Sequence, residues 1–342
     1  MHINVLTDRA WEWLRASRSE PPGRASSGAR RKTYATALEQ AGQMFKAAAA
    51  VGPATRPLQV FYGLSQAGRA VAAAAWSLKG EDWRLEAHGI KATGFDRAFP
   101  DIEIRTDPPD SQGSFTRVSQ VLASPVWQLA PVRLEDVWDL LPVNLDYPLT
   151  ERERLTPLEV SEHHVGQHDH PLLSVPVSDI PDRVIDAGTR VALAEFMASY
   201  PGLDQHESYV TTRALTLGPD ALPDFTRYAE GGGALQVNWL MPQGSATEAE
   251  RRQHLRAMTH GHGGLRFFFP VIAPMARELH PLMAWWAVLY TLSMLARYEP
   301  ARWAAHINVD SSPHAVPIER LLELAIVQVP VLIRDAVAEV AR

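Results

Sequence analysis

The chain has 342 residues, of which 46% are hydrophobic and 21% charged, so it is predicted to be globular rather than disordered. This length allows two cores, or one domain with a large insertion. The formal net charge of −6 argues against a protein that coats nucleic acid by bulk charge, and the absence of cysteine excludes disulfides, thiolate metal sites and a cysteine nucleophile.

The N-terminal part of the chain is predicted to be helical. Residues 4–16 form a short amphipathic helix, and residues 30–51 form a longer one that ends at Gly52-Pro53. Residues 56–78 form a third helix, with a proline where the first turn tolerates it. This helix contains glycines and a run of four alanines, which let a second helix approach closely. A tightly packed bundle is therefore expected.

The middle of the chain is predicted to be rich in β-structure, because short alternating segments are bounded by Gly, Pro, Asp or Asn. These segments are 83–87, 102–106, 114–118, 155–159, 172–177, 209–217, 234–240 and 265–271. Helical periodicity interrupts them at residues 134–141 and 186–200. Residues 247–258 are a polar helix, in which Thr247 and Glu250 have the spacing of a capping box.

The C-terminal part is predicted to be helical again. Residues 280–297 are apolar on all sides and are expected to be a buried central helix. Residues 318–340 are amphipathic, and Pro330 is expected to kink this helix. The uncharged run 281–296 is shorter than the roughly 20 residues that span a bilayer, and residues 1–15 lack the apolar core of a signal peptide. A cytoplasmic protein without a membrane partner is expected.

The predicted fold class is α+β. Residues 1–79 and 279–342 are expected to form one helical bundle, which contains both ends of the chain. Residues 80–278 are expected to be a β-rich insertion between the two halves of the bundle.

Several segments resemble the YaaC-like family of bacterial proteins. They are FYGLSQAGRAVAAA at residues 61–74, AHGI at 87–90, LSMLARYEPARW at 292–303, and the helix pattern of 318–333. The likeness spans most of the chain and implies an architecture rather than a reaction. The paired helices also resemble, at the level of the fold, HEPN-type bundles, a group that includes RNases of bacterial toxin and phage-defence systems.

The densest polar cluster of the predicted bundle contains Arg297, Glu299, Arg302 and His306. Pro300 suits the start of a new helix, on which Arg302 and His306 would share a face. Two interpretations are open. Arg297 and Glu299 form a buried pair that fixes the helix corner, or the cluster holds a phosphate or phosphodiester, which the planar guanidinium contacts through two nitrogens.

Two further candidate sites contain histidine. Arg256 and His262 have the spacing that HEPN-type RNases use, which implies that the arginine stabilises phosphate charge and the histidine moves a proton. The alternative is a glycine-rich turn at residues 259–264. His88, followed by Gly89, either titrates near neutral pH at a loop or stabilises a turn by hydrogen bonding.

The most metal-like residues are His164, His168 and His170, since neighbouring histidines can bind zinc or another divalent ion. Gly166 and Pro171 favour instead a solvated loop. The chain lacks the phosphate-loop, dinucleotide-binding and nucleophile-elbow motifs, so no cofactor is expected.

Two functions are compatible with the sequence, which leaves enzymatic activity open. One is a HEPN-like, RNA- or nucleic-acid-directed component of a stress or phage-defence system. The other is a non-enzymatic interaction or regulatory module that binds a partner chain or a copy of itself. The small-residue helix and ten tryptophans favour such a protein interface.

Overall fold

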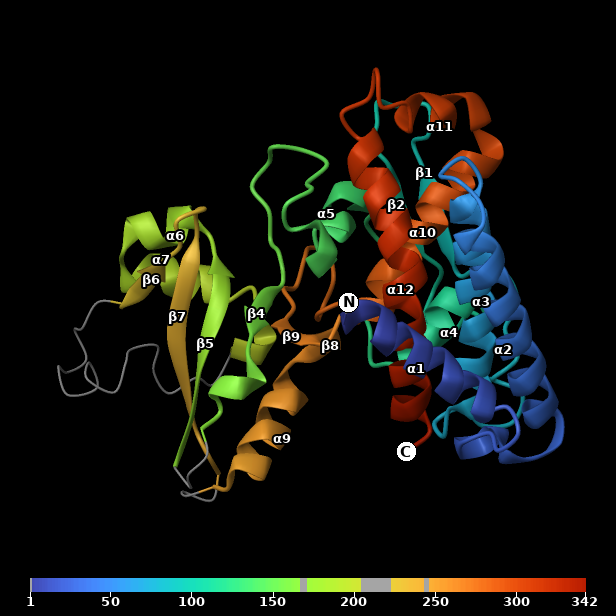
Figure 1. The fold of residues 1–342 in the computed structure, drawn as a ribbon, viewed down its shortest axis with the longest axis horizontal. Coiled ribbons are helices and arrows are strands. Elements are labelled where there is room, and N and C mark those ends of the chain that lie inside the picture. The colour runs from blue at the N-terminus through green and yellow to red at the C-terminus, as the bar shows by residue number, and fades with distance from the viewer. Residues whose placement is uncertain (1, 167–170, 204–222, 243–245) are drawn as a thin grey trace. The chain divides into compact units, whose positions relative to one another are not determined.

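The computed structural model describes residues 2–166, 171–203, 223–242 and 246–342. It contains two compact units, and the α+β class predicted from the sequence is confirmed (Figure 1). The first unit comprises Met1–Arg154 and Ala273–Arg342, and the second comprises Leu155–Ile272. Residues 80–154, which the sequence analysis assigned to the insertion, thus belong to the same unit as the helices.

Helices from both ends of the chain form the bundle of the first unit. They are α1 (His2–Ala16), α2 (Gly28–Ala49), α3 (Arg56–Ala74), α10 (Pro281–Tyr298), α11 (Pro300–His306) and α12 (Ala315–Val340). Helix α3 packs against α2, α10 and α12, while α1 packs against α12 (Figure 1). The predicted bundle of N- and C-terminal helices is therefore confirmed.

Small residues of α3 bring the central helices together. A Cβ atom on Gly68 would lie 2.3 Å from the ring of Trp286 in α10, so the indole occupies the space that a side chain would need. Every residue of α10 from Pro281 to Ala296 is buried, as its apolar sequence predicts. No helix in the described part of the chain is long and apolar enough to cross a lipid bilayer.

A small antiparallel sheet accompanies the bundle, with the described strands in the order β1-β2-β3. They are β1 (Ile90–Thr93), β2 (Glu103–Thr106) and β3 (Val132–Arg133), with helices α4 (Ser114–Val121) and α5 (Leu134–Trp138) beside them in the sequence. Two strand predictions were wrong. Residues 114–118 lie in α4, and residues 83–87 form turns with a single bridge at Glu86. The first amides of α4 donate to carbonyls near residue 88, a tertiary contact that local alternation does not reveal.

The second unit contains an antiparallel sheet, whose described strands have the order β6-β7-β5-β4-β9-β8. The strands are β4 (Leu158–Val160), β5 (Leu172–Ile180), β6 (Phe225–Arg227), β7 (Gly233–Leu240), β8 (His260–His262) and β9 (Leu265–Phe268). The helices are α6 (Asp182–Ala187), α7 (Arg190–Met197) and α9 (Glu248–Met258). The predicted capping box of α9 is confirmed, whereas the predicted strand 209–217 lies outside the described residues.

Candidate functional site

Residues from three of the four segments that carry the family resemblance come together in the first unit. Tyr62 comes from α3, His88 from the loop before β1, and Arg297 from the last turn of α10. Arg297 Nη1 donates a hydrogen bond of 2.6 Å to the Tyr62 hydroxyl. The His88 ring centroid lies 5.7 Å from that of Tyr290 in α10. We call Tyr62, His88, Tyr290 and Arg297 the tyrosine–histidine cluster.

Close backbone packing holds His88 in place. Gly89 has φ of +73°, and a Cβ atom there would lie 2.9 Å from the Cα of Gly113. Glycine is therefore required both for the conformation and for the approach of the two backbones. The Phe115 amide donates to the His88 carbonyl at 2.9 Å, so the start of α4 fixes the same loop. The backbone that carries the His88 imidazole is therefore closely packed against the start of α4.

The surroundings of His88 favour the neutral form of its ring. Burial, and after it the nearby charge of Arg297, lowers the pKa of His88 below its usual value of about 6.5. Neither ring nitrogen has a hydrogen-bond partner among the described residues. Burial also raises the pKa of Tyr290 to about 12, so this phenol keeps its proton. The cluster therefore combines a proton-accepting imidazole, protonated phenol and a guanidinium.

Arg297 is exposed, and its guanidinium carbon lies 5.1 Å from the ring centroid of Tyr298. The Tyr298 residue is 60% exposed, so an aromatic face lies open beside a cation. The interpretation of Arg297 and Glu299 as a buried pair is wrong, because Arg297 bonds to Tyr62 while Glu299 lies 3.7 Å from Arg302. The open guanidinium is chemically suited to an anionic ligand.

The other residues of the predicted arginine cluster form a separate group. Arg302 pairs with Glu299 and donates to the Asp96 carbonyl at 3.1 Å. The His306 ring lies 4.7 Å from that of Phe99, which also contacts His314 at 5.0 Å. Burial first, then His314 and Arg302, lowers the pKa of His306. The four predicted residues are thus divided between two environments.

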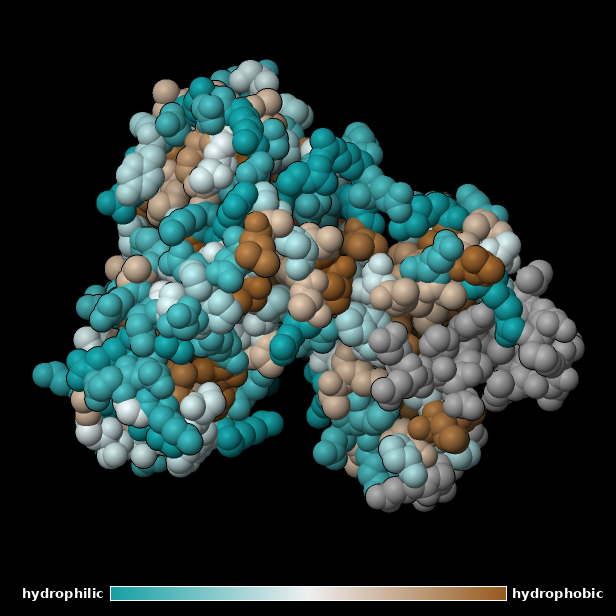
Figure 2. Space-filling model, turned by 180° about the vertical axis from the view of Figure 1, so that it is seen from behind, coloured by the Kyte–Doolittle hydropathy of each residue, from teal (hydrophilic) through white to brown (hydrophobic). Residues whose placement is uncertain are grey.

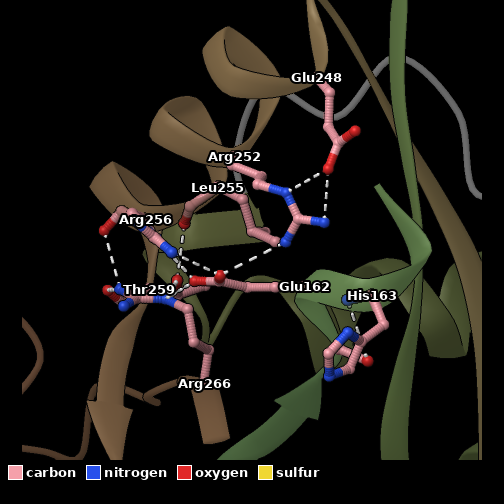
Figure 3. A network of polar contacts seen from close by, with 9 residues as sticks. Glu162, His163, Glu248, Arg252, Leu255, Arg256, Thr259 and Arg266 are labelled. Carbon is pink, nitrogen blue, oxygen red and sulfur yellow. Dashed lines mark hydrogen bonds and ion pairs between the residues drawn. The ribbon is translucent and has the colours of Figure 1, made fainter. Parts of the chain in front are cut away.

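In the second unit, Arg256 and His262 have different surroundings. Arg256 donates two hydrogen bonds of 2.8 Å each to the carboxylate of Glu162 (Figure 3). His262 is only 4% exposed, and burial lowers its pKa to about 4. The arginine is thus engaged by a carboxylate and the imidazole lies in the interior. This arrangement does not present the two side chains jointly to a phosphodiester in solvent.

Three arginines surround Glu162. Besides Arg256, the nitrogens of Arg252 and Arg266 lie 3.7 and 3.6 Å from its carboxylate (Figure 3). The hydrogen bonds from Arg256 are the main cause of a lowered pKa of Glu162. The contact joins α9 to the short 3₁₀ turn Glu162–His164. No sequence pattern pointed to it, because Glu162 and Arg256 are 94 residues apart.

The predicted metal site is only partly within the described residues. His164 lies in the 3₁₀ turn at residues 162–164, whereas His168 and His170 lie outside the described ranges. Within those ranges, no group of three or more His, Asp or Glu side chains has the geometry to hold a metal ion.

Sequence reasoning missed some residues of the first unit that lie at these sites. Tyr62 is part of the motif at residues 61–74 that carries the resemblance, but the motif does not distinguish it from a residue that only packs. Tyr290 belongs to an all-apolar helix, in which it looks like any other core residue. Phe99 and His314 lie in connecting segments whose meeting depends on the fold alone.

Comparison with known proteins gives one finding. Neither the curated proteins nor the solved structures yield a match, so the expected likeness to HEPN-type bundles has no support from these comparisons. A family model described as YaaC-like protein matches residues 8–337. Because this match covers almost the whole chain, the chain belongs to the YaaC-like protein family.

Proposed function

We propose that the tyrosine–histidine cluster binds single-stranded RNA and that His88 accepts a proton from it. The observation that supports this most is an exposed Arg297, held by Tyr62, whose charge acts on the partly buried His88 and helps to lower its pKa. The guanidinium would contact a phosphate, and the open face of Tyr298 would stack on a base. Within a cell, this activity would suit an RNA-directed component of a stress or phage-defence system.

The proposed chemistry uses the ribose hydroxyl. His88 would take the proton of a 2′-hydroxyl while that oxygen attacks the adjacent phosphorus and the bond to the 5′-oxygen breaks, and the leaving oxygen would take a proton from water. Arg297 would stabilise the negative charge that develops on the phosphoryl oxygens. A neutral imidazole is needed for the first step, and the lowered pKa of His88 supplies it at pH 7.

The alternative is the protein-interaction module. Large hydrophobic side chains are exposed at Trp76, Leu129 and Val309. In Figure 2, hydrophobic residues on the visible face form small patches separated by hydrophilic ones. Because small separated patches do not favour a large apolar interface, this face does not support the module, and the RNA proposal is preferred.

A binding experiment tests the first part of the proposal. Fluorescence anisotropy with a labelled single-stranded RNA would compare the wild type with Arg297→Ala, which should weaken binding about tenfold. Arg84→Ala is a matched control, because Arg84 is also an exposed arginine over an aromatic ring, that of Trp83 at 5.2 Å, and is not part of the cluster. Equal losses in both variants, or no loss in either, would contradict the proposal.

A cleavage assay tests the second part. End-labelled RNA is incubated with the wild type, His88→Ala, Arg302→Ala and His306→Ala, and the products are separated by size. Only His88→Ala should abolish cleavage while leaving RNA affinity within about twofold, since the imidazole moves a proton rather than holding the strand. A DNA strand of the same sequence should not be cut, because it lacks the 2′-hydroxyl. Cleavage by His88→Ala at the wild-type rate would refute the assignment.

A further inference from the structure

A cavity of about 800 Å³ lies in the first unit between α1, α2 and α12. Small-molecule sites usually have volumes of about 300 to 1,000 Å³. Its apolar lining comes from Trp11, Leu14, Leu38, Phe45, Ala49, Ile326 and Val327. Its charged lining comes from Asp8, Arg15, Arg18, Glu39 and Lys46. The cavity shares no lining residue with the tyrosine–histidine cluster, so it is a second, independent site.

A missing side chain on α2 keeps this space open. Gly42 faces α1, and a Cβ atom there would lie 3.6 Å from the ring of Trp11, an ordinary contact distance. The rings of Trp11 and Phe45 meet edge to face at 5.5 Å and form an aromatic wall. Thr7 Oγ1 donates to the Val327 carbonyl at 2.7 Å, which fastens α1 to α12. The cavity therefore has an aromatic wall, and apolar and charged side chains share the rest of its lining.

The charges of the lining are unevenly distributed. Because Trp11 contacts Phe45 while Arg18 pairs with Glu39, α1 and α2 run antiparallel. Arg15 and Arg18 thus lie towards the end of the cavity that contains Glu39. Asp8 and Lys46 lie towards the other end, and their charges have opposite signs. The first end holds two arginines and one carboxylate, which leaves one positive charge uncompensated.

The same end has an unsatisfied donor. Glu39 is engaged by Arg18 and by Gln43, which donates to it at 2.8 Å. Arg18 Nε is nevertheless buried without a hydrogen-bond partner among the described residues. This nitrogen has almost no accessible surface, so a ligand in the cavity would contact Arg18 through the exposed part of its side chain, which is 35% exposed.

We propose that this cavity binds an amphipathic monocarboxylate of the fatty-acid class. The hydrocarbon chain would lie against Trp11, Leu14 and Phe45, where its burial from water is favourable. The carboxylate would lie beside Arg15 and Arg18, where its single negative charge balances the uncompensated positive one.

Calorimetric titration of the full chain tests this with three probes: dodecanoate below its micellar concentration, dodecanol and acetate. Dodecanoate should bind one to one, dodecanol about tenfold more weakly, and acetate not measurably, because both the chain and the charge are needed. Arg15→Ala should weaken dodecanoate binding about tenfold and leave dodecanol binding unchanged. Arg9→Ala, on the same helix outside the lining, should change neither affinity.

Filling the cavity provides a second test. Gly42→Phe should abolish dodecanoate binding, while Gly42→Ala, which leaves room and suits a helix, should retain it. Circular dichroism melts establish that both variants fold. Wild-type affinity in Gly42→Phe, equal affinity for dodecanol and dodecanoate, or no binding by the wild type would overturn the proposal. A wild-type dimer that Gly42→Phe converts to a monomer in sedimentation would also overturn it, because a second copy would then occupy the cavity.

Discussion

The hydroxyl of Tyr62 accepts a 2.6 Å hydrogen bond from Arg297, which is 235 residues further along the chain. This contact joins α3, near the N-terminus, to the C-terminal end of α10. It also orients the guanidinium close enough to His88 for its charge to lower the pKa of that imidazole. The hydrogen bond from Arg297 to Tyr62 thus joins two helices of the bundle and also positions a charged group of the candidate site.

Removing the Tyr62 hydroxyl should affect binding more than folding. In Tyr62→Phe, Arg297 loses the group that orients it, and we expect RNA affinity to fall about threefold to fivefold. The free energy of unfolding should change by less than about 1 kcal/mol, because the bond is partly exposed to water. Anisotropy and urea unfolding measure the two quantities. Tyr298→Phe keeps the stacking ring and is the control, and a similar affinity loss there would speak against an orienting role for Tyr62.

The backbone at Gly89 should not tolerate a side chain. Gly89→Ala forces a Cβ atom into the left-handed region and to within 2.9 Å of Gly113. We expect a loss of about 2–4 kcal/mol in the free energy of unfolding, with the support of His88 disrupted. Gly52→Ala is the control, since nothing lies within 4 Å of its Cβ position. Denaturant unfolding measures both, and equal stability of the two variants would exclude the close-approach argument.

The stability of the second unit should depend on pH through His262. Its folded pKa of about 4 lies below the unfolded value of about 6.5, so between these values the unfolded state binds more protons. Stability therefore falls as the pH falls from about 6.5 to about 4, by about 3 kcal/mol in total. In His262→Gln this contribution should be absent, and the variant's loss between pH 7 and pH 4.5 should be smaller.

The wild-type curve alone does not isolate this effect. Burial raises the pKa of Asp139 in the first unit to about 6, above its ordinary value of 3.8. That group has the opposite sign, since the folded state binds more protons between these values and gains stability as the pH falls. The comparison of wild type with His262→Gln cancels the Asp139 contribution. Parallel curves for the two proteins would show that His262 is not the source.

Replacing Glu162 by a neutral residue should destabilise the second unit and the packing of α9. Glu162→Gln leaves Arg252, Arg256 and Arg266 close together without their shared counter-charge (Figure 3). We expect a loss of about 1–3 kcal/mol in the free energy of unfolding, reduced at high salt, which screens the arginine repulsion. Glu248→Gln, which removes a carboxylate that pairs with Arg252 alone, is the control and should cost less. Hydrogen exchange of the α9 amides should rise only in Glu162→Gln.

Local pattern was sufficient for much of the fold. The apolar sequence of residues 281–296 predicted a buried helix, and Thr247 with Glu250 predicted the start of α9. The local pattern gave a wrong strand at residues 114–118, where the alternation of polar and apolar residues also fits a short helix. There the carbonyls of Ala87 and His88 accept the first amides of α4, and this long-range contact decided the structure.

By itself, the sequence determined the helical ends of the chain, the β-rich character of its middle and the family. It did so because the period of apolar residues along one element records which face that element buries. Only the tertiary structure decided that Arg297 meets Tyr62 and His88 rather than Glu299, and that Glu162 engages Arg256. Side chains from distant segments become neighbours through packing, and no local spacing encodes which of them meet.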